Sequence, residues 1–228
     1  MESWAEKYRP ESLSDIIGNT KVINDLKTWA KSWGDKMVKK GVILSGPPGC
    51  GKTSAAIALA NDMEWEVIEL NASDARSGAV IEGTALRAGL FQTFGSKGLA
   101  DRNLILLDEA DNLYERARQS KNKTKNYSDR GGKRAITKTL EQTKQPVVIT
   151  VNDLYNLTKG TGAKIKRLCL NLKFQRPSVV SIATVLQNIC QNEGLEISNE
   201  SIRSMAENVK GDLRGAINDL QSLSEGNK

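Results

Sequence analysis

Hydrophobic residues along the chain follow two successive patterns, short apolar runs first and helical stripes afterwards. Five short runs predict buried strands, at Gly41–Ser45, Glu66–Leu70, Leu104–Leu107, Val147–Val151 and Leu168–Phe174. The stretches between these runs are long enough for helical crossovers. We therefore predict an α/β fold with a five-stranded parallel sheet and helices on both of its faces.

Beyond Pro177, apolar residues recur at the i, i+3, i+4, i+7 spacing of amphipathic helices. There are three such stripes: Ile182, Val185, Leu186 and Ile189; Ile202, Met205, Ala206 and Val209; and Leu213, Ala216, Ile217 and Leu220. They predict a small three-helix domain. Proline restricts its own backbone and that of its predecessor, so the predicted hinge is Arg176–Pro177, between domains 1–176 and 177–228. We expect further C-terminal domains to lie outside this chain.

The composition is that of an ordinary folded protein, with 39% hydrophobic and 26% charged residues among 228. The apolar runs are too short to cross a membrane and the N-terminus has no apolar leader, so neither a membrane span nor a secretory signal is expected. The chain has no histidine, and its three cysteines form no C-x-x-C pair. Zinc sites and Ser-His or Cys-His catalysis are therefore excluded, and the cysteine usage favours a reducing, intracellular setting.

The net charge of +6 is concentrated in one segment. Residues 116–134 carry eight basic side chains and one acidic one, a charge of +7 that leaves −1 for the rest of the chain. Such a field favours a polyanionic partner, although a solvated loop is the alternative. The candidate DNA contacts in and beside this segment are Lys121, Lys123, Lys125, Arg130, Lys133 and Arg134.

A phosphate-binding motif follows the first predicted strand, where Gly46-x-x-x-x-Gly51-Lys52-Thr53 matches the P-loop. Its backbone N–H groups would cradle phosphates, Lys52 would neutralise the β- and γ-phosphates, and the Thr53 hydroxyl would ligate Mg²⁺. A dinucleotide-binding reading fails because Ser54 stands where a third glycine is needed. The candidate nucleotide contacts here are Pro48, Gly49, Cys50, Gly51, Lys52, Thr53 and Ser54.

Polar residues end two of the other predicted strands. Asp108 and Glu109 follow the third apolar run, at the strand end where α/β sheets bind ligands. Asp108 would hold Mg²⁺ and Glu109 would polarise the attacking water, whereas without a P-loop this acidic pair would be read as a helix cap. Asn152 follows the fourth run and could contact the γ-phosphate and the lytic water, or simply form a turn.

A cation in the last helical stripe is placed against the helix dipole. Asp212 is the predicted N-cap, so Leu213 and Arg214 stand in the first turn, where a positive charge costs roughly 0.3–1 kcal/mol. An anionic ligand would compensate, which makes Arg214 a candidate γ-phosphate contact on a helical lid. The alternative is an ordinary surface arginine beside Asp212 or Asp219.

Taken together, the P-loop, Asp108-Glu109, Asn152 and Arg214 resemble the AAA+ ATPases. Further motifs are similar to the replication factor C clamp loaders of archaea and eukaryotes: Trp4-Ala-Glu-Lys-Tyr-Arg-Pro10, Ile16-Ile-Gly-Asn19, Asn71-Ala-Ser-Asp74 and Gly211-Asp-Leu-Arg-Gly-Ala-Ile-Asn218. The resemblance extends from Trp4 to Leu220. It implies ATP and Mg²⁺ as cofactors, with catalytic roles for Lys52, Glu109, Asn152 and Arg214.

Two features resemble the large subunit of these complexes. Small subunits carry a Ser-Arg-Cys motif whose arginine reaches a neighbour's ATP site, but this chain has Arg167-Leu168-Cys169. On a strand, Arg167 would point away from the position of that arginine. The segment Asp129-Arg-Gly-Gly132 is also similar to large subunits, which implies a subunit at one end of the ring that accepts an arginine without donating one.

The resemblance also implies contacts beyond the phosphates. An adenine pocket would be formed by Tyr8, Arg9, Pro10, Ile16, Ile17 and Gly18, with Leu213 from the lid, although Tyr8 and Pro10 are equally suited to packing. Arg76 would face DNA, or be a plain surface residue. Leu90, Phe91 and Phe94 stand where large subunits contact the clamp, or they pack in the core.

The function implied is a large subunit that uses ATP to open a ring-shaped sliding clamp and load it on primer-template DNA, together with small subunits. The alternatives are another AAA+ DNA motor of the branch-migration type and a nucleotide-gated DNA-binding module without significant catalysis. Weak ATPase activity is expected of the chain alone. The location would be cytoplasmic in an archaeon and nuclear in a eukaryote, and the short segment before Trp4 favours an archaeal origin.

Overall fold

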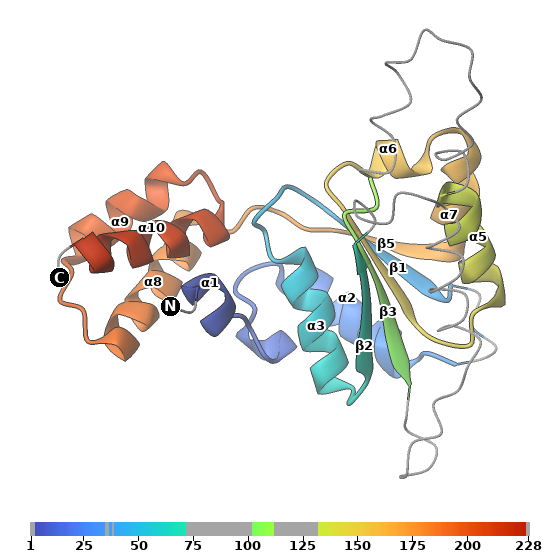
Figure 1. Ribbon diagram of the computed structural model, residues 1–228, viewed down its shortest axis with the longest axis horizontal. Coiled ribbons are helices and arrows are strands. Elements are labelled where there is room, and N and C mark those ends of the chain that lie inside the picture. The colour runs from blue at the N-terminus through green and yellow to red at the C-terminus, as the bar shows by residue number, and fades with distance from the viewer. Residues whose placement is uncertain (1–2, 35–36, 38, 72–101, 112–131, 227–228) are drawn as a thin grey trace, which may run out of the picture.

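The computed structural model describes residues 3–34, 37, 39–71, 102–111 and 132–226. Its centre is a five-stranded sheet with the order β2-β3-β4-β1-β5, in which every neighbouring pair is parallel (Figure 1). The strands are β1 (Gly41–Ser45), β2 (Glu66–Asn71), β3 (Asn103–Asp108), β4 (Val147–Val151) and β5 (Cys169–Lys173). The predicted five-stranded parallel sheet is confirmed.

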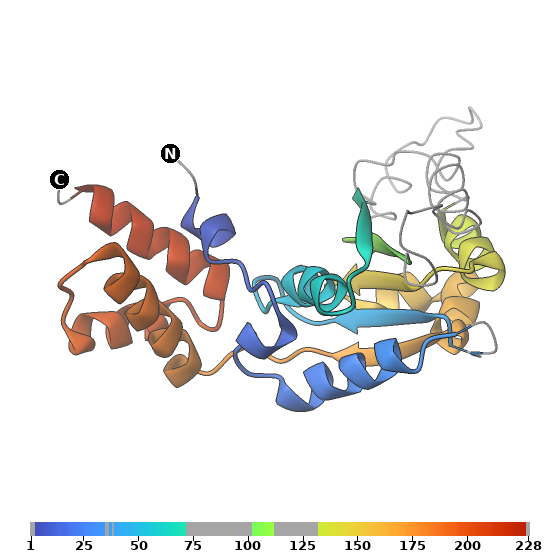
Figure 2. The same cartoon turned by 90° about the horizontal axis from the view of Figure 1, so that it is seen from below.

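Helices cover both faces of this sheet, as predicted (Figure 1, Figure 2). The helices α2 (Thr20–Lys31) and α3 (Lys52–Asp62) pack on one face, while α5 (Gly132–Gln142), α6 (Leu154–Thr158) and α7 (Ala163–Leu168) pack on the other. Alternate strand residues divide between the two cores, so Leu44 belongs to the first and Ile43 to the second. Short 3₁₀ turns occur at Leu13–Asp15 (η1) and Gly160–Gly162 (η3).

The last three helices form a separate small domain, the lid (Figure 1). They are α8 (Val179–Glu193), α9 (Asn199–Asn208) and α10 (Leu213–Gly226), and all three predicted stripes face one core. Side-chain caps begin α8 and α9, where Ser178 and Ser198 accept hydrogen bonds from backbone N–H groups in the first turn.

The N-terminal helix α1 (Trp4–Lys7) packs on the lid rather than on the sheet. Trp4 and Tyr8 join the lid core, and the Trp4 backbone N–H donates to Oε1 of Gln221 at 2.8 Å. Figure 2 shows α1 beside α10, although the predicted boundary assigned α1 to the first domain. The chain thus crosses between the two domains twice, once after α1 and once between β5 and α8.

The start of the fifth strand differs from the prediction. Arg167 and Leu168 are the last residues of α7, and β5 begins only at Cys169. The prediction that Arg167 lies on a strand, and so points away from the position of the small-subunit arginine, is therefore wrong in its premise. Arg167 lies at the end of a helix, and the helix sets the direction of its side chain. Leu168 is half-buried and packs against the core under α5 and α7.

No helix in the described ranges is long and apolar enough to cross a membrane.

Candidate nucleotide site

A pocket lies where the carboxyl edge of the sheet meets the lid and the N-terminal segment. Its lining includes most of the residues predicted to contact nucleotide or metal: Tyr8, Arg9, Pro10, Ile16, Ile17, Pro48, Gly49, Cys50, Gly51, Lys52, Thr53, Ser54, Asp108, Glu109, Asn152, Leu213 and Arg214. Gly18 is the one predicted residue of this group that is not part of the lining. Residues from both ends of the chain are thus brought together around one cavity.

The P-loop connects β1 to α3, and its backbone requires glycine at two points. Gly49 and Gly51 have φ angles of 71° and 94°, in the left-handed region. A Cβ atom on Gly49 would also lie 2.0 Å from Oδ1 of Asp212, so the lid approaches this loop closely. Because Gly51 is the N-cap of α3 and offers no side-chain cap, the helix begins in the loop with an N-terminus that suits an anion.

Lys52 occupies the centre of the loop and is only 8% exposed. Its Nζ donates to the carbonyl oxygens of Gly46 at 2.9 Å and Pro47 at 2.8 Å, and to Oδ1 of Asn152 at 2.9 Å. Burial lowers the pKa of Lys52, while nearby acidic groups oppose that shift. The contact to Asn152 brings the ends of β1 and β4 together at the predicted phosphate position.

Asp108 and Thr53 meet at the end of β3, where the Thr53 hydroxyl donates to Oδ1 of Asp108 at 2.9 Å. This pair fits Mg²⁺, which prefers oxygen ligands and is usually held by one or two protein oxygens together with phosphates and water. The described residues contain no cluster of three or more histidine, cysteine or acidic side chains that could enclose a metal alone.

Glu109 lies next to this pair in an unusual backbone conformation. Its φ is 53°, in the left-handed region that non-glycine residues rarely adopt, and its side chain is exposed. The Glu109 N–H donates to Oγ1 of Thr150 at 3.0 Å. Residues held in this way are typical of active sites, where surrounding contacts maintain a strained geometry.

Two residues that the sequence analysis overlooked hold these groups. The buried Thr150 hydroxyl donates to Oδ1 of Asp108 and accepts from the Glu109 backbone N–H, so it fixes the Asp108 carboxylate and the backbone of Glu109. Asp111 is also buried, and its Oδ2 accepts from the backbone N–H groups of Asn152 and Asp153, each at 3.0 Å. The sequence contains a signal for each residue. Thr150 places a hydroxyl inside the apolar run Val147–Val151, and Asp111 is a third acid that follows Asp108-Glu109.

The lid contributes the N-terminus of α10. Asp212 caps this helix as predicted, accepting from the Gly215 N–H at 3.0 Å, and the Leu213 N–H donates to the Gly49 carbonyl at 3.3 Å. Arg214 is exposed and lines the pocket, and among the described residues no carboxylate is within ion-pair distance of it. This arrangement leaves the cation facing a cavity that also contains Lys52.

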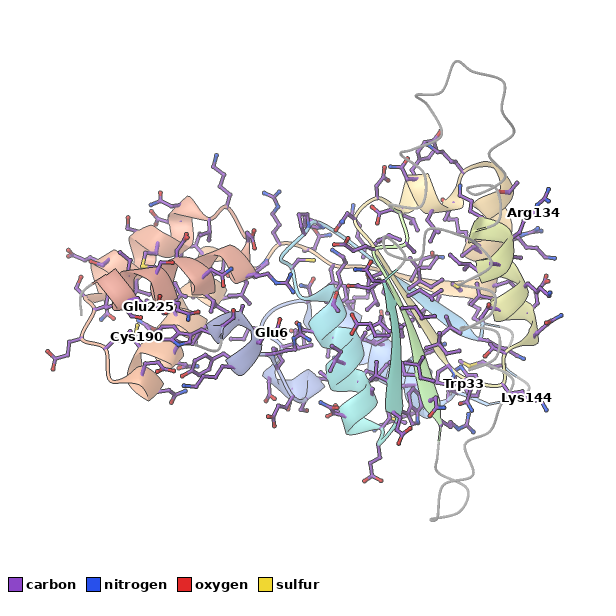
Figure 3. All side chains as sticks on the ribbon, in the orientation of Figure 1. Glu6, Trp33, Arg134, Lys144, Cys190 and Glu225 are labelled. Atoms are coloured by element: carbon purple, nitrogen blue, oxygen red, sulfur yellow. The ribbon has the colours of Figure 1, made fainter. Side chains whose placement is uncertain are left out.

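The remaining predicted contacts have different outcomes. Arg76, Leu90, Phe91, Phe94, Lys121, Lys123, Lys125 and Arg130 lie outside the described residues. Arg134 is exposed on α5, away from the lid (Figure 3). Lys133 departs from the expectation: it is 3% exposed, its Nζ donates to the Lys159 carbonyl at 2.6 Å, and burial lowers its pKa. A buried ammonium group bonded to the backbone does not fit a contact to DNA phosphates.

Comparison with known proteins agrees with this geometry. Residues 42–167 match the ATPase family associated with various cellular activities (AAA), and residues 184–224 match the AAA+ ATPase lid domain of the RCF1/5-like type. The chain belongs to the AAA family of ATPases, whose fold implies nucleotide binding. The Holliday junction branch migration motor RuvB of Thermotoga maritima has the same fold, with a TM-score of 0.70 and 17% identity over 96% of this chain and 65% of that one.

More specific similarity comes from archaeal replication proteins. The chain is 46% identical to the replication factor C large subunit of Methanosarcina mazei, over 99% of this chain and 34% of that protein. It is 43% identical to the large subunit of Halorubrum lacusprofundi, over 99% of this chain and 44% of that protein. The predicted resemblance to replication factor C large subunits is confirmed, and the chain spans less than half the length of these relatives.

Proposed function

We propose that this chain is the ATPase and lid region of a clamp-loader large subunit, which uses ATP to open a ring-shaped sliding clamp and load it on primer-template DNA. The observation that carries the proposal is a P-loop pocket closed by a lid arginine, within a chain similar throughout to replication factor C large subunits. Because those relatives are more than twice as long, further domains would complete the subunit. The proposed division is an ATPase domain up to residue 176 and a lid from residue 177.

In the proposed reaction, the P-loop binds the triphosphate of ATP. Lys52 would exchange its carbonyl partners for the β- and γ-phosphates, which compensate better for its burial. Asn152, already within hydrogen-bond distance of Lys52, would orient the lytic water at the γ-phosphate. Glu109 would accept a proton from that water, since its side chain is exposed into the same pocket.

Thr53 and Asp108 are the proposed holders of Mg²⁺. When bound, the ion would neutralise charge on the phosphate oxygens. The contribution of the chain is to fix the Asp108 carboxylate, which already accepts hydrogen bonds from Thr53 and Thr150. Arg214 would complete the charge balance from the lid and make lid closure dependent on the γ-phosphate.

The arginine finger would come from a neighbouring subunit. Leu168 occupies the position of the finger in the family motif, and its half-buried side chain packs against the core under α5 and α7. Arg167 precedes it at the exposed end of α7. We therefore propose that this subunit accepts an arginine from a small subunit and stands at one end of the ring.

The proposed partners are clamp-loader small subunits, the sliding clamp and DNA, inside an archaeal cell. Arg76, Lys121, Lys123, Lys125, Arg130 and Arg134 remain proposed DNA contacts, and Leu90, Phe91 and Phe94 remain proposed clamp contacts. Electrostatic contacts of this kind would make DNA affinity fall steeply with salt.

ATP turnover, measured with and without archaeal replication factor C small subunits, tests the proposal. The chain alone is expected to be slow because it lacks the neighbour's arginine, a group worth about 10³–10⁵ in rate in P-loop enzymes. Small subunits should raise turnover, and Glu109→Gln should abolish the share contributed by this chain. Fast turnover by the isolated chain that small subunits do not change would contradict the proposal, as would a stable homohexamer formed with ATP.

A further inference from the structure

The segment Trp4–Leu13, which we call the strap, crosses from the lid to the sheet domain beside the nucleotide pocket. At its lid end, Trp4 and Tyr8 pack into the lid core with their rings edge to face, 6.4 Å between centroids. At its other end, Leu13 is 2% exposed within the core formed by α2, α3 and the sheet. Arg9 and Pro10, between these anchors, line the pocket.

One carboxylate attaches the lid end of the strap to α8, in addition to the bond between Trp4 and Gln221 of α10. Oε1 of Glu193, the last residue of α8, accepts from the Tyr8 hydroxyl at 2.5 Å and from Nζ of Lys7 at 2.5 Å. The Glu193 side chain is 20% exposed, against 46% for Lys7, so the ion pair is partly shielded from water. Such charge-assisted bonds are stronger than neutral ones.

The sheet end is held independently of the lid. The side-chain amide of Asn61 donates to the Glu11 carbonyl at 2.9 Å, and the Leu13 N–H donates to Oδ2 of Asp62 at 3.3 Å. Both partners belong to the C-terminal end of α3, the helix that begins at the P-loop. The strap is therefore tied to α3 at one end and to α8 at the other.

Because the strap is attached at both ends, Tyr8 lies against the nucleotide pocket and the lid at the same time. Tyr8 lines the nucleotide pocket, and its hydroxyl is bonded to the lid. Burial and the hydrogen bond to Glu193 raise the pKa of Tyr8. Lys52 of the P-loop bonds to Gly46, Pro47 and Asn152, whereas Tyr8 bonds to Glu193, so the two ends of the pocket are supported by separate contacts.

We propose that Glu193 is a positioning residue for recognition of the nucleotide base, acting through Tyr8 and the strap. This inference rests on the proposed function, since it assumes that ATP occupies the pocket with its base toward the strap. Removal of the Glu193 carboxylate frees the Tyr8 hydroxyl and Lys7 ammonium together and unfastens the strap from α8. The base would then meet a pocket wall that is no longer fixed, while the phosphates would meet an unchanged P-loop.

The experiment compares two ligands on the full chain by calorimetry, ATP and inorganic tripolyphosphate, both with Mg²⁺. Glu193→Ala should weaken ATP binding about tenfold, the scale of one charge-assisted hydrogen bond, and leave tripolyphosphate binding unchanged. Glu193→Gln, which retains an acceptor for Tyr8, should fall between wild type and Glu193→Ala. Tyr8→Phe should weaken ATP alone and add little further loss in the Glu193→Ala background, because both changes remove one interaction.

The matched control is Glu207→Gln on α9, which removes a carboxylate paired with Arg203 at 3.2 Å on the exposed surface of the lid. It should change neither affinity. Equal weakening of both ligands by Glu193→Ala and Glu193→Gln, or no change in either, would overturn the proposal. If the wild-type chain binds neither ligand, the proposed function itself fails. If the wild-type chain binds both ligands and the variants keep the same ratio of ATP affinity to tripolyphosphate affinity, only the role of Glu193 is rejected.

Discussion

Replacement of Thr150 by valine is the sharpest single test of how the catalytic carboxylates are held. Valine keeps the shape of threonine in β4 but removes the hydroxyl that donates to Asp108 and accepts from the Glu109 N–H at 3.0 Å. The first bond involves a charged group, worth about 1.5–3 kcal/mol, and the second is neutral, worth about 0.5–1.5 kcal/mol.

The loss of unfolding free energy should be smaller than the sum of these two hydrogen bonds. Asp108 keeps the Thr53 hydroxyl at 2.9 Å, and Glu109 is exposed enough for water to replace the lost acceptor. We therefore expect unfolding free energy to fall by about 1–2 kcal/mol, or roughly 2–8 °C in melting temperature for a chain of this size. The larger effect should be on kcat, on the order of 10²-fold, because the Asp108 carboxylate and the backbone that carries Glu109 both lose a contact that aligns them.

The assays are denaturant unfolding, ATP binding, and ATP turnover in the reconstituted complex with small subunits. ATP affinity should stay close to wild type, since Lys52 and the P-loop are untouched. Thr139→Val is the matched control: Thr139 is 1% exposed, and its hydroxyl has no hydrogen-bond partner in the described part of the chain, so turnover should be unchanged and stability equal or higher. Wild-type turnover in Thr150→Val would refute the positioning argument, as would an equal loss of turnover in Thr139→Val.

Three further predictions follow from other buried groups. Asp111→Asn weakens the acceptor for two backbone N–H groups, including that of Asn152, so turnover should fall at least tenfold while ATP affinity changes less; equal losses in both would contradict this. Burial raises the pKa of the Cys169 thiol to about 12, so native chain should resist an Ellman reagent at pH 8 at this position, and prompt labelling located by mass spectrometry would contradict the buried environment. The lowered pKa of Lys52 means that the folded chain disfavours the charged form of this side chain. The unfolding free energy of wild type, measured relative to that of Lys52→Met, should therefore rise as the pH increases through the folded-state pKa toward 10.5. A difference in unfolding free energy that stays flat or falls over this pH range would contradict the lowered pKa.

The sheet and its pocket-edge residues could be predicted because their signals are local. Val147–Val151 is apolar throughout since β4 is buried on both faces, and strand ends in a parallel sheet share one edge. The sequence alone therefore predicts that Lys52, Asp108 and Asn152 lie near each other. Family resemblance added Tyr8, which no local pattern distinguishes from a packing residue.

What could not be predicted depends on contacts between distant parts of the chain. The bond from Trp4 to Gln221 joins residues 217 positions apart, so nothing near α1 indicates that it packs on the lid. Lys133 was grouped with its basic neighbours, yet helix α5 turns it inward to the Lys159 carbonyl. The strand predicted from Leu168 begins one residue later, because an apolar residue ending a helix resembles one that starts a strand.

ATP-dependent capture of a sliding clamp is the decisive measurement of whether this chain acts in a clamp loader. Tagged chain, assembled with archaeal replication factor C small subunits, would be incubated with a ring clamp in ATP or ADP and recovered. We expect stable capture in ATP, weak capture in ADP, and a loss of the ATP-dependent part when Lys52→Ala removes the buried cation from the P-loop. Capture that is equal in the two nucleotides and unaffected by Lys52→Ala would contradict it.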